Sequence, residues 1–106
     1  MKDTEDFIAL CAAKEKLLWT YHINMRLKTR DINTEDVIHA LKDCKVIEEY
    51  PQDAPLPSCL VLGKDKQNKV IHVVVAVDND EENLRIITSY RPTLEYWEKD
   101  LKTRRR

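Results

Sequence analysis

Glycine is almost absent from this sequence, with one glycine in 106 residues. The loops that hold phosphates in P-loop and dinucleotide-binding proteins need several glycines at fixed spacing, and neither motif occurs. The nucleophile elbow of serine hydrolases is also excluded, because Ser58 and Ser89 lack its flanking glycines. The sequence therefore supports none of the nucleotide or hydrolase sites that depend on glycine, and no cofactor is expected.

Cysteine is scarce and widely spaced. Cys11, Cys44 and Cys59 form no CxxC pair, which argues against a zinc site or a disulfide framework and predicts buried free thiols. The three histidines are too scattered to indicate a metal site. Long apolar runs are missing as well, and the first residues, MKDTEDF, do not resemble a signal peptide. We expect a cytoplasmic protein without a bound metal.

An excess of positive charge is also missing. The 18 basic and 19 acidic residues give a net charge of −1, which offers no global attraction to nucleic acid. Any anion site must then be a local patch. Arg104–Arg106 is such a patch, although a charged terminal run is more often a solvated tail.

Two β-branched runs dominate what is present, VIHVVVAVD and LRIITSYR within residues 70–91. Joined by polar turn residues, they predict an antiparallel hairpin with both faces largely covered. Pairing Asp78 with Leu84 would place His72 opposite Tyr90 and Val74 opposite Thr88, on one face. A slip of one residue would separate these partners, so the register is a hypothesis.

Helices are predicted before and after the strands in the chain. Residues 4–18 and 19–30 have amphipathic spacing, the second with Thr20 as its cap, and 33–43 begin with a capping box of Asn33 and Asp36. A last helix capped by Thr93 would carry Leu94, Trp97 and Leu101 on one face.

The expected fold is one α+β domain, residues 1–106. Its N-terminal helices would pack on a four-stranded antiparallel sheet, made from strands at 46–50 and 58–62 and the hairpin, and a short C-terminal helix would follow. The residues expected in its core are Trp19, Ile23, Leu27, Val37, Leu41, Val73, Val75 and Ile87.

A row of cations lies beside the apolar stripe of the second helix. His22, Arg26 and Arg30 recur every four residues, which places them on one helix face. Arginine offers a permanent planar fork and histidine a titratable proton, so the row suits a phosphate. The alternative is a solvated basic edge, which is the commoner use of such a stripe.

The segment HINMRLKTRDINTEDVIHAL resembles the H-x-x-x-R-x-x-x-R-x-I-x-x-x-D-V pattern of a small bacterial family, domain of unknown function family 4258. VIEEYP, PSCLVLG, IHVVVA and IITSYRP match its second half in order. Members often neighbour a gene for an antitoxin with zinc-finger and helix-turn-helix parts. The resemblance implies a relative of the RelE, MqsR and BrnT toxins, which are compact ribonucleases that cleave messenger RNA.

This resemblance implies a metal-independent endoribonuclease of a type II toxin–antitoxin system, in which the RNA 2′-OH attacks the adjacent phosphate. Its partners would be RNA and an antitoxin protein. His72 or His22 would act as base, and Tyr90 as acid or as a positioning group. The cations and hydroxyl that would hold substrate and stabilise charge are Arg26, Arg30, Arg91 and Thr88.

Two alternatives remain open at this point. A buried strand histidine such as His72 is as often satisfied by a neighbouring hydroxyl as used in catalysis. The second alternative is that the whole domain is a non-catalytic protein-binding module, which uses the same sheet face and the C-terminal helix for protein contacts. A ribonuclease needs a base, an acid and a cation around one opening, whereas a binding module shows an exposed apolar patch.

Overall fold

The computed structural model describes residues 2–105, which form three helices and five strands. The elements in chain order are α1 (Lys2–Ala13), β1 (Leu17–Trp19), α2 (Tyr21–Thr29), α3 (Thr34–Lys42), β2 (Lys45–Tyr50), β3 (Ser58–Lys64), β4 (Val70–Asp78) and β5 (Asn83–Tyr90). The expected α+β class is confirmed, and no helix in the described residues is long and apolar enough to cross a membrane.

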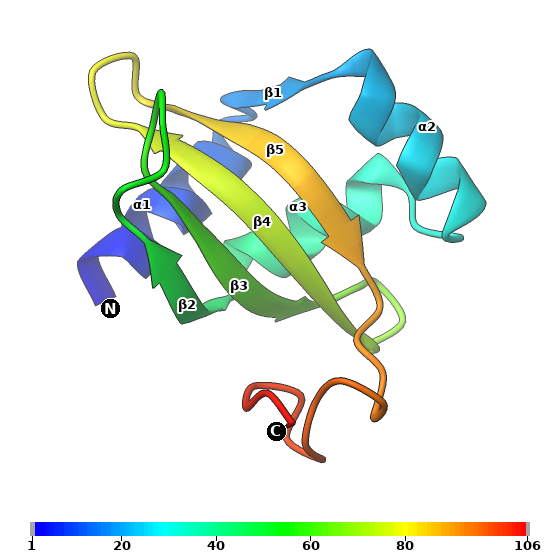
Figure 1. Ribbon diagram of the computed structural model, residues 1–106. Coiled ribbons are helices and arrows are strands. Elements are labelled where there is room, and N and C mark those ends of the chain that lie inside the picture. The colour runs from blue at the N-terminus through cyan, green and yellow to red at the C-terminus, as the bar shows by residue number, and fades with distance from the viewer. Residues whose placement is uncertain (1, 106) are drawn as a thin grey trace.

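The sheet has five strands in the order β1-β5-β4-β3-β2 (Figure 1). Strands β2 to β5 form the expected antiparallel meander, but β1 adds a parallel strand beside β5. The prediction of a four-stranded antiparallel sheet is therefore wrong, and the sheet is mixed.

Strand β1 comes from the end of the segment predicted as the first helix. The helix ends at Ala13, Glu15 has a positive φ of 56°, and Leu17–Trp19 pairs with β5. Without β1, this edge of β5 would leave its backbone donors and acceptors without strand partners. Trp19, expected in the second helix, is consequently a strand residue and only partly buried.

The other two helices begin as predicted. Thr20 caps α2 by accepting a hydrogen bond from the Ile23 amide. Asn33 and Asp36 form the capping box of α3. Local side-chain chemistry therefore fixes both starts, as it does in isolated helices.

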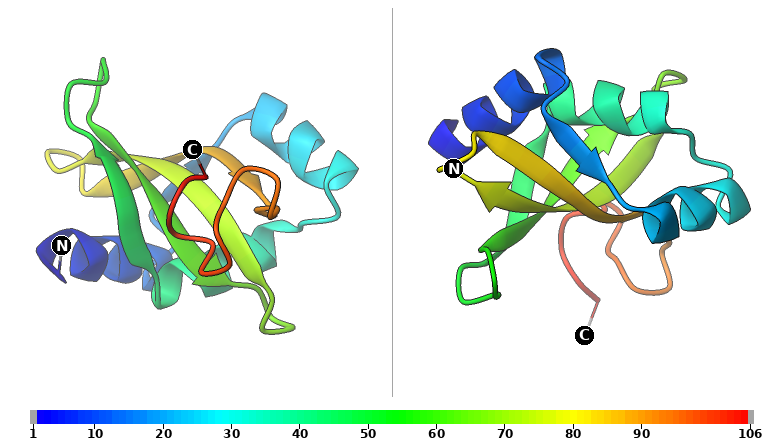
Figure 2. Two further views of the ribbon diagram at one scale, coloured as in Figure 1. Left: turned by 60° about the horizontal axis from the view of Figure 1, so that its bottom comes forward. Right: turned by 90° about the horizontal axis from the view of Figure 1, so that it is seen from above.

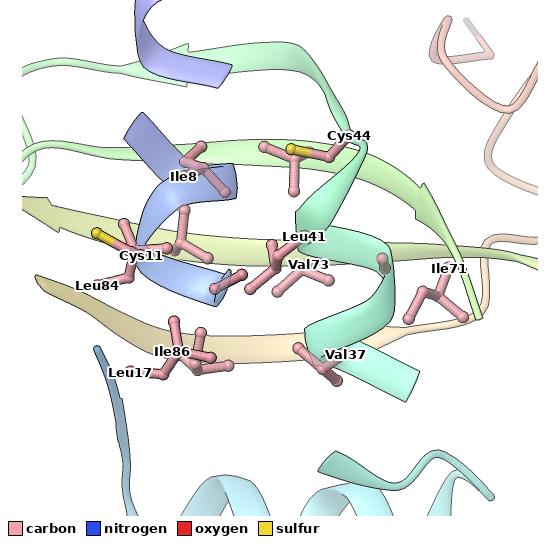
Figure 3. Packing of buried hydrophobic residues seen from close by; sticks show 14 of the residues in the cluster. Ile8, Cys11, Leu17, Val37, Leu41, Cys44, Ile71, Val73, Leu84 and Ile86 are labelled. Atoms are coloured by element: carbon pink, nitrogen blue, oxygen red, sulfur yellow. The ribbon is translucent and has the colours of Figure 1, made fainter. Parts of the chain in front are cut away.

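Helices α1 and α3 cover one face of the sheet, and the C-terminal segment crosses the other (Figure 2). The main core lies between the helices and the sheet, where Ile8, Leu41 and Val73 come together (Figure 3). The predicted core residues that are buried are Ile23, Leu27, Val37, Leu41, Val73 and Val75. The three cysteines are buried free thiols, as expected.

The β4–β5 register contains two offsets that cancel. The turn is one residue shorter than predicted, so Asp78 pairs with Asn83, and the predicted pairing of Asp78 with Leu84 is wrong. A bulge between Val74 and Val75 then restores the predicted pairs of His72 with Tyr90 and Val74 with Thr88. The bulge leaves Ile87 without a partner and 49% exposed, so its predicted burial is wrong.

The C-terminal helix predicted from Thr93 does not form in the described residues, where turns and one bridge between Trp97 and Arg104 replace it. Asp100 accepts hydrogen bonds from the amides of Lys102 and Thr103. Leu101 has a positive φ of 59°. A side chain that binds nearby backbone amides competes with helix formation, and a left-handed residue is incompatible with it. We call residues 92–105 the strap.

Candidate functional site

The polar groups of interest lie on the sheet face opposite α1 and α3, which we call the outer face. His72 pairs with Leu62 and Tyr90, while Glu48 and Val74 both pair with Leu60. Residues directly opposite each other on neighbouring strands share a face, and alternate residues of one strand share it too. The register therefore brings side chains from β2, β4 and β5 to one surface.

His72 is at the centre of this face and is fully buried, with 0% of its surface exposed. Its Nδ1 lies 3.2 Å from the Tyr90 hydroxyl and its Nε2 lies 2.7 Å from the Leu101 carbonyl oxygen. The imidazole also meets the rings of Tyr90 and Trp97 edge to face, at centroid distances of 5.3 and 4.5 Å. Both ring nitrogens therefore have partners, and one of those partners belongs to the strap.

An ion pair lies beside this histidine. Arg104 of the strap donates to both carboxylate oxygens of Glu48, at 2.6 and 3.0 Å, and its guanidinium lies 4.7 Å from the centre of the Trp97 ring. The Tyr50 hydroxyl also donates to Glu48. We call Glu48, Tyr50, His72, Tyr90 and Arg104 the outer cluster.

The protonation states within the outer cluster follow from burial and charge. Desolvation lowers the pKa of His72 below its usual value, so the ring is neutral at pH 7. The Arg104 hydrogen bonds lower the pKa of Glu48, which keeps the carboxylate ionised. Desolvation raises the pKa of Tyr90, and desolvation with the Glu48 hydrogen bond raises that of Tyr50 to about 12. Both phenols therefore stay protonated.

Arg30 extends the polar surface from α2 onto β5. Its guanidinium donates to the Thr88 hydroxyl at 3.0 Å and to the Ser89 carbonyl oxygen at 2.8 Å. Thr88 and Tyr90 are two residues apart, on the same side of β5. His22 and Arg26 are exposed on the turns of α2 that precede Arg30.

Arg91 is bound elsewhere. It pairs with the buried carboxylate of Asp65 at 2.9 Å and donates to the Asp31 carbonyl oxygen at 3.1 Å. These two residues and Arg91 line a surface cleft of about 340 Å³ beside the loop from α2 to α3. Of the predicted site residues, the structure thus joins His72 to Tyr90 and Arg30 to Thr88, and gives Arg91 separate partners.

Sequence reasoning missed three members of the outer cluster, Glu48, Tyr50 and Arg104, and the contact of Trp97 with His72. No local motif marks Glu48, because its face depends on a register shift in the β2–β3 pairing between Val46 and Glu48. The only signal was the terminal arginine run. Its first member, Arg104, makes a specific ion pair, and Arg106 lies outside the described residues.

Comparison with protein families identifies the family of this chain. The family described as Domain of unknown function (DUF4258) matches residues 19–91, which is more than half of the chain. The chain belongs to the DUF4258 family. The match begins at Trp19, the last residue of β1, and ends directly after β5, so it includes β2 to β5 and excludes the strap. Comparisons with curated proteins and with solved structures give no significant match.

Proposed function

We propose that this DUF4258 protein is a metal-independent endoribonuclease, a RelE-like messenger-RNA interferase of a type II toxin–antitoxin system, that acts in the cytoplasm. The observation that carries the proposal is that, on one sheet face, Tyr90 is hydrogen-bonded to His72 and the Arg30 guanidinium is bound to Thr88, two residues before Tyr90. This arrangement supplies titratable groups and a cation at one place, which are the groups that general acid–base cleavage of RNA requires.

His72 is the proposed base. The Tyr90 hydroxyl is bonded to its Nδ1, and an imidazole with an unperturbed pKa of about 6.5 is mostly neutral at pH 7. With the ring proton on Nδ1 and directed at the Tyr90 oxygen, Nε2 accepts the proton of the RNA 2′-hydroxyl. The 2′-oxygen then bonds to phosphorus, the bond from phosphorus to the 5′-oxygen breaks, and that oxygen takes a proton from water. The hydroxide that remains takes the proton from the His72 imidazolium, which restores the neutral base. The products are a 2′,3′-cyclic phosphate and a 5′-hydroxyl.

Arg30 is the proposed cation for the phosphate. The Thr88 hydroxyl and the Ser89 carbonyl oxygen fix its guanidinium beside Tyr90. A positioned guanidinium stabilises the charge that develops on the phosphoryl oxygens. Arg26 lies one helical turn before Arg30 and His22 two turns before it, so we assign both to contacts with the RNA backbone that flanks the cleaved bond.

A second candidate function is a non-catalytic protein-binding module. The observation in its favour is a group of exposed apolar side chains on adjacent elements, namely Leu18 of β1, Tyr21 and Met25 of α2 and Ile87 of β5. Large apolar side chains that are exposed close together in this way are typical of protein contacts. In the ribonuclease proposal the same surface receives the antitoxin, so the two candidates differ in catalysis and not in docking.

The experiment that separates them is RNA cleavage by the purified protein in excess EDTA. The ribonuclease proposal expects 2′,3′-cyclic phosphate ends, and the binding module expects intact RNA.

A further inference from the structure

We infer that the strap is an intramolecular inhibitor that occupies the RNA site of the outer face and must open before substrate binds. This inference rests on the proposed function, since it names the regulation of the same site. Figure 2 shows the strap crossing the face opposite the helices, over the strands that carry His72 and Glu48.

The strap covers the groups that the proposed reaction needs. The Leu101 carbonyl oxygen occupies Nε2 of His72, the nitrogen that the reaction needs. Arg104 occupies both oxygens of Glu48. A substrate cannot reach the base while these contacts hold, because His72 has no exposed surface.

The strap places an aromatic ring where the proposed substrate would lie. The Trp97 ring meets the His72 imidazole edge to face, at a centroid distance of 4.5 Å, and the Arg104 guanidinium lies over its ring. Proteins that bind single-stranded RNA hold the flat bases with aromatic side chains and arginine planes. Trp97 therefore occupies space next to the proposed base that a flat aromatic group fits.

The strap has its own internal hydrogen bonds and few anchors on the sheet. Backbone hydrogen bonds join Glu98 to Thr103 and Arg105 to Tyr96 within it. Among the described residues of the strap, Trp97 alone is buried. The family match ends before the strap begins. Opening therefore requires the release of the Trp97, Leu101 and Arg104 contacts with the outer face, and not the unfolding of the sheet.

The test compares the wild-type protein with Arg104→Ala in the full chain, with Lys102→Ala as the control. Both variants lose one positive charge from the strap, but only Arg104 binds Glu48 and Trp97. Opening is measured by hydrogen–deuterium exchange of residues 94–105. RNA binding is measured with a single-stranded 2′-O-methyl oligonucleotide, which cannot be cleaved, and activity with the unmodified oligonucleotide.

We expect Arg104→Ala to raise the opening equilibrium about fivefold to thirtyfold, from the loss of the ion pair and the cation–π contact. RNA affinity and cleavage rate should rise by the same factor, and Lys102→Ala should match wild type. Trp97→Ser in the Arg104→Ala background is the second variant, with a larger expected opening. Unchanged exchange in both variants would overturn the inference that these contacts hold the strap closed.

The remaining outcomes separate the inference from the function. If the strap opens and wild type and variant cleave RNA equally fast, the inhibitor inference is wrong and the ribonuclease proposal stands. If the strap opens and no protein binds or cleaves RNA, the ribonuclease proposal is wrong, and the inference fails with it.

Discussion

The imidazole Nε2 of His72 lies 2.7 Å from the main-chain carbonyl oxygen of Leu101, which joins the middle of the sheet to the strap. A main-chain carbonyl only accepts hydrogen bonds, so Nε2 carries the proton in the closed state and Nδ1 accepts from the Tyr90 hydroxyl. The proposed base is therefore held neutral but in the tautomer that cannot accept a proton at Nε2. Opening the strap releases that nitrogen.

Burial of His72 predicts a pH dependence of folding stability. Its pKa is lowered in the folded protein, so the unfolded chain takes up a proton first, near its usual pKa of about 6.5. The contribution of neutral His72 to the free energy of unfolding is complete above that pH. It is lost as the pH falls below it, by at most about 1.4 kcal/mol per pH unit.

Urea unfolding at pH 7.0 and pH 5.5 measures this effect. Wild type should lose stability between the two values, and His72→Gln should lose clearly less. His39→Gln, which removes an exposed histidine, should retain the wild-type difference. Equal losses in all three proteins would show that His72 is not the titrating group.

Gly63 predicts a steric cost. A Cβ atom at this position would lie 2.4 Å from the Ala40 carbonyl oxygen of α3, and neither backbone can move away without disturbing the core. We expect Gly63→Ala to lower the free energy of unfolding by about 1–3 kcal/mol. Lys64→Ala, at the exposed next position, should change it by less than about 0.5 kcal/mol. Denaturant unfolding measures both, and a neutral Gly63→Ala would contradict the close packing of α3 on β3.

Arg91 should affect stability and not catalysis. Burial opposes ionisation of Asp65, but amide hydrogen bonds from Lys69 and Gln67 and the Arg91 ion pair outweigh it and lower the pKa of Asp65. Arg91→Gln leaves this buried carboxylate without its cation, and we expect a loss of about 1–3 kcal/mol. Its RNA cleavage rate, measured where the variant is fully folded, should equal that of wild type. A large loss of cleavage rate in the fully folded variant would show that Arg91 belongs to the catalytic site.

Local signals in the sequence were sufficient for part of the fold. The caps at Thr20 and Asn33 depend on residues three apart in the chain, and the pattern of β4 reports burial on both faces. Leu17–Trp19 carries no such signal, because its state depends on the open edge of a strand more than 60 residues away. The spacing of Leu94, Trp97 and Leu101 fits a helix. The turn at Asp100 and the packing of Trp97 against His72 stabilise the irregular strap more than this spacing stabilises a helix.

The candidate site was predictable to a similar extent. His72 and Tyr90 follow from hairpin counting, although the correct pairing required a shorter turn and a bulge that compensate each other. Glu48 and Arg104 are 56 residues apart, and no pattern in either segment indicates that they meet. Contacts of this kind form only in the tertiary structure, so the sequence alone could not predict them.

The most direct test of the central claim is cleavage of a single-stranded RNA in excess EDTA, with ends identified by mass spectrometry. Wild type and the strap-opening variant Arg104→Ala are compared with His72→Gln, Tyr90→Phe and Arg30→Gln in the Arg104→Ala background, all shown to be folded. We predict 2′,3′-cyclic phosphate ends, a faster rate for Arg104→Ala, and a loss of about 10²–10⁴-fold for His72→Gln. Intact RNA with both wild type and Arg104→Ala, or cleavage that His72→Gln leaves unchanged, would contradict the account.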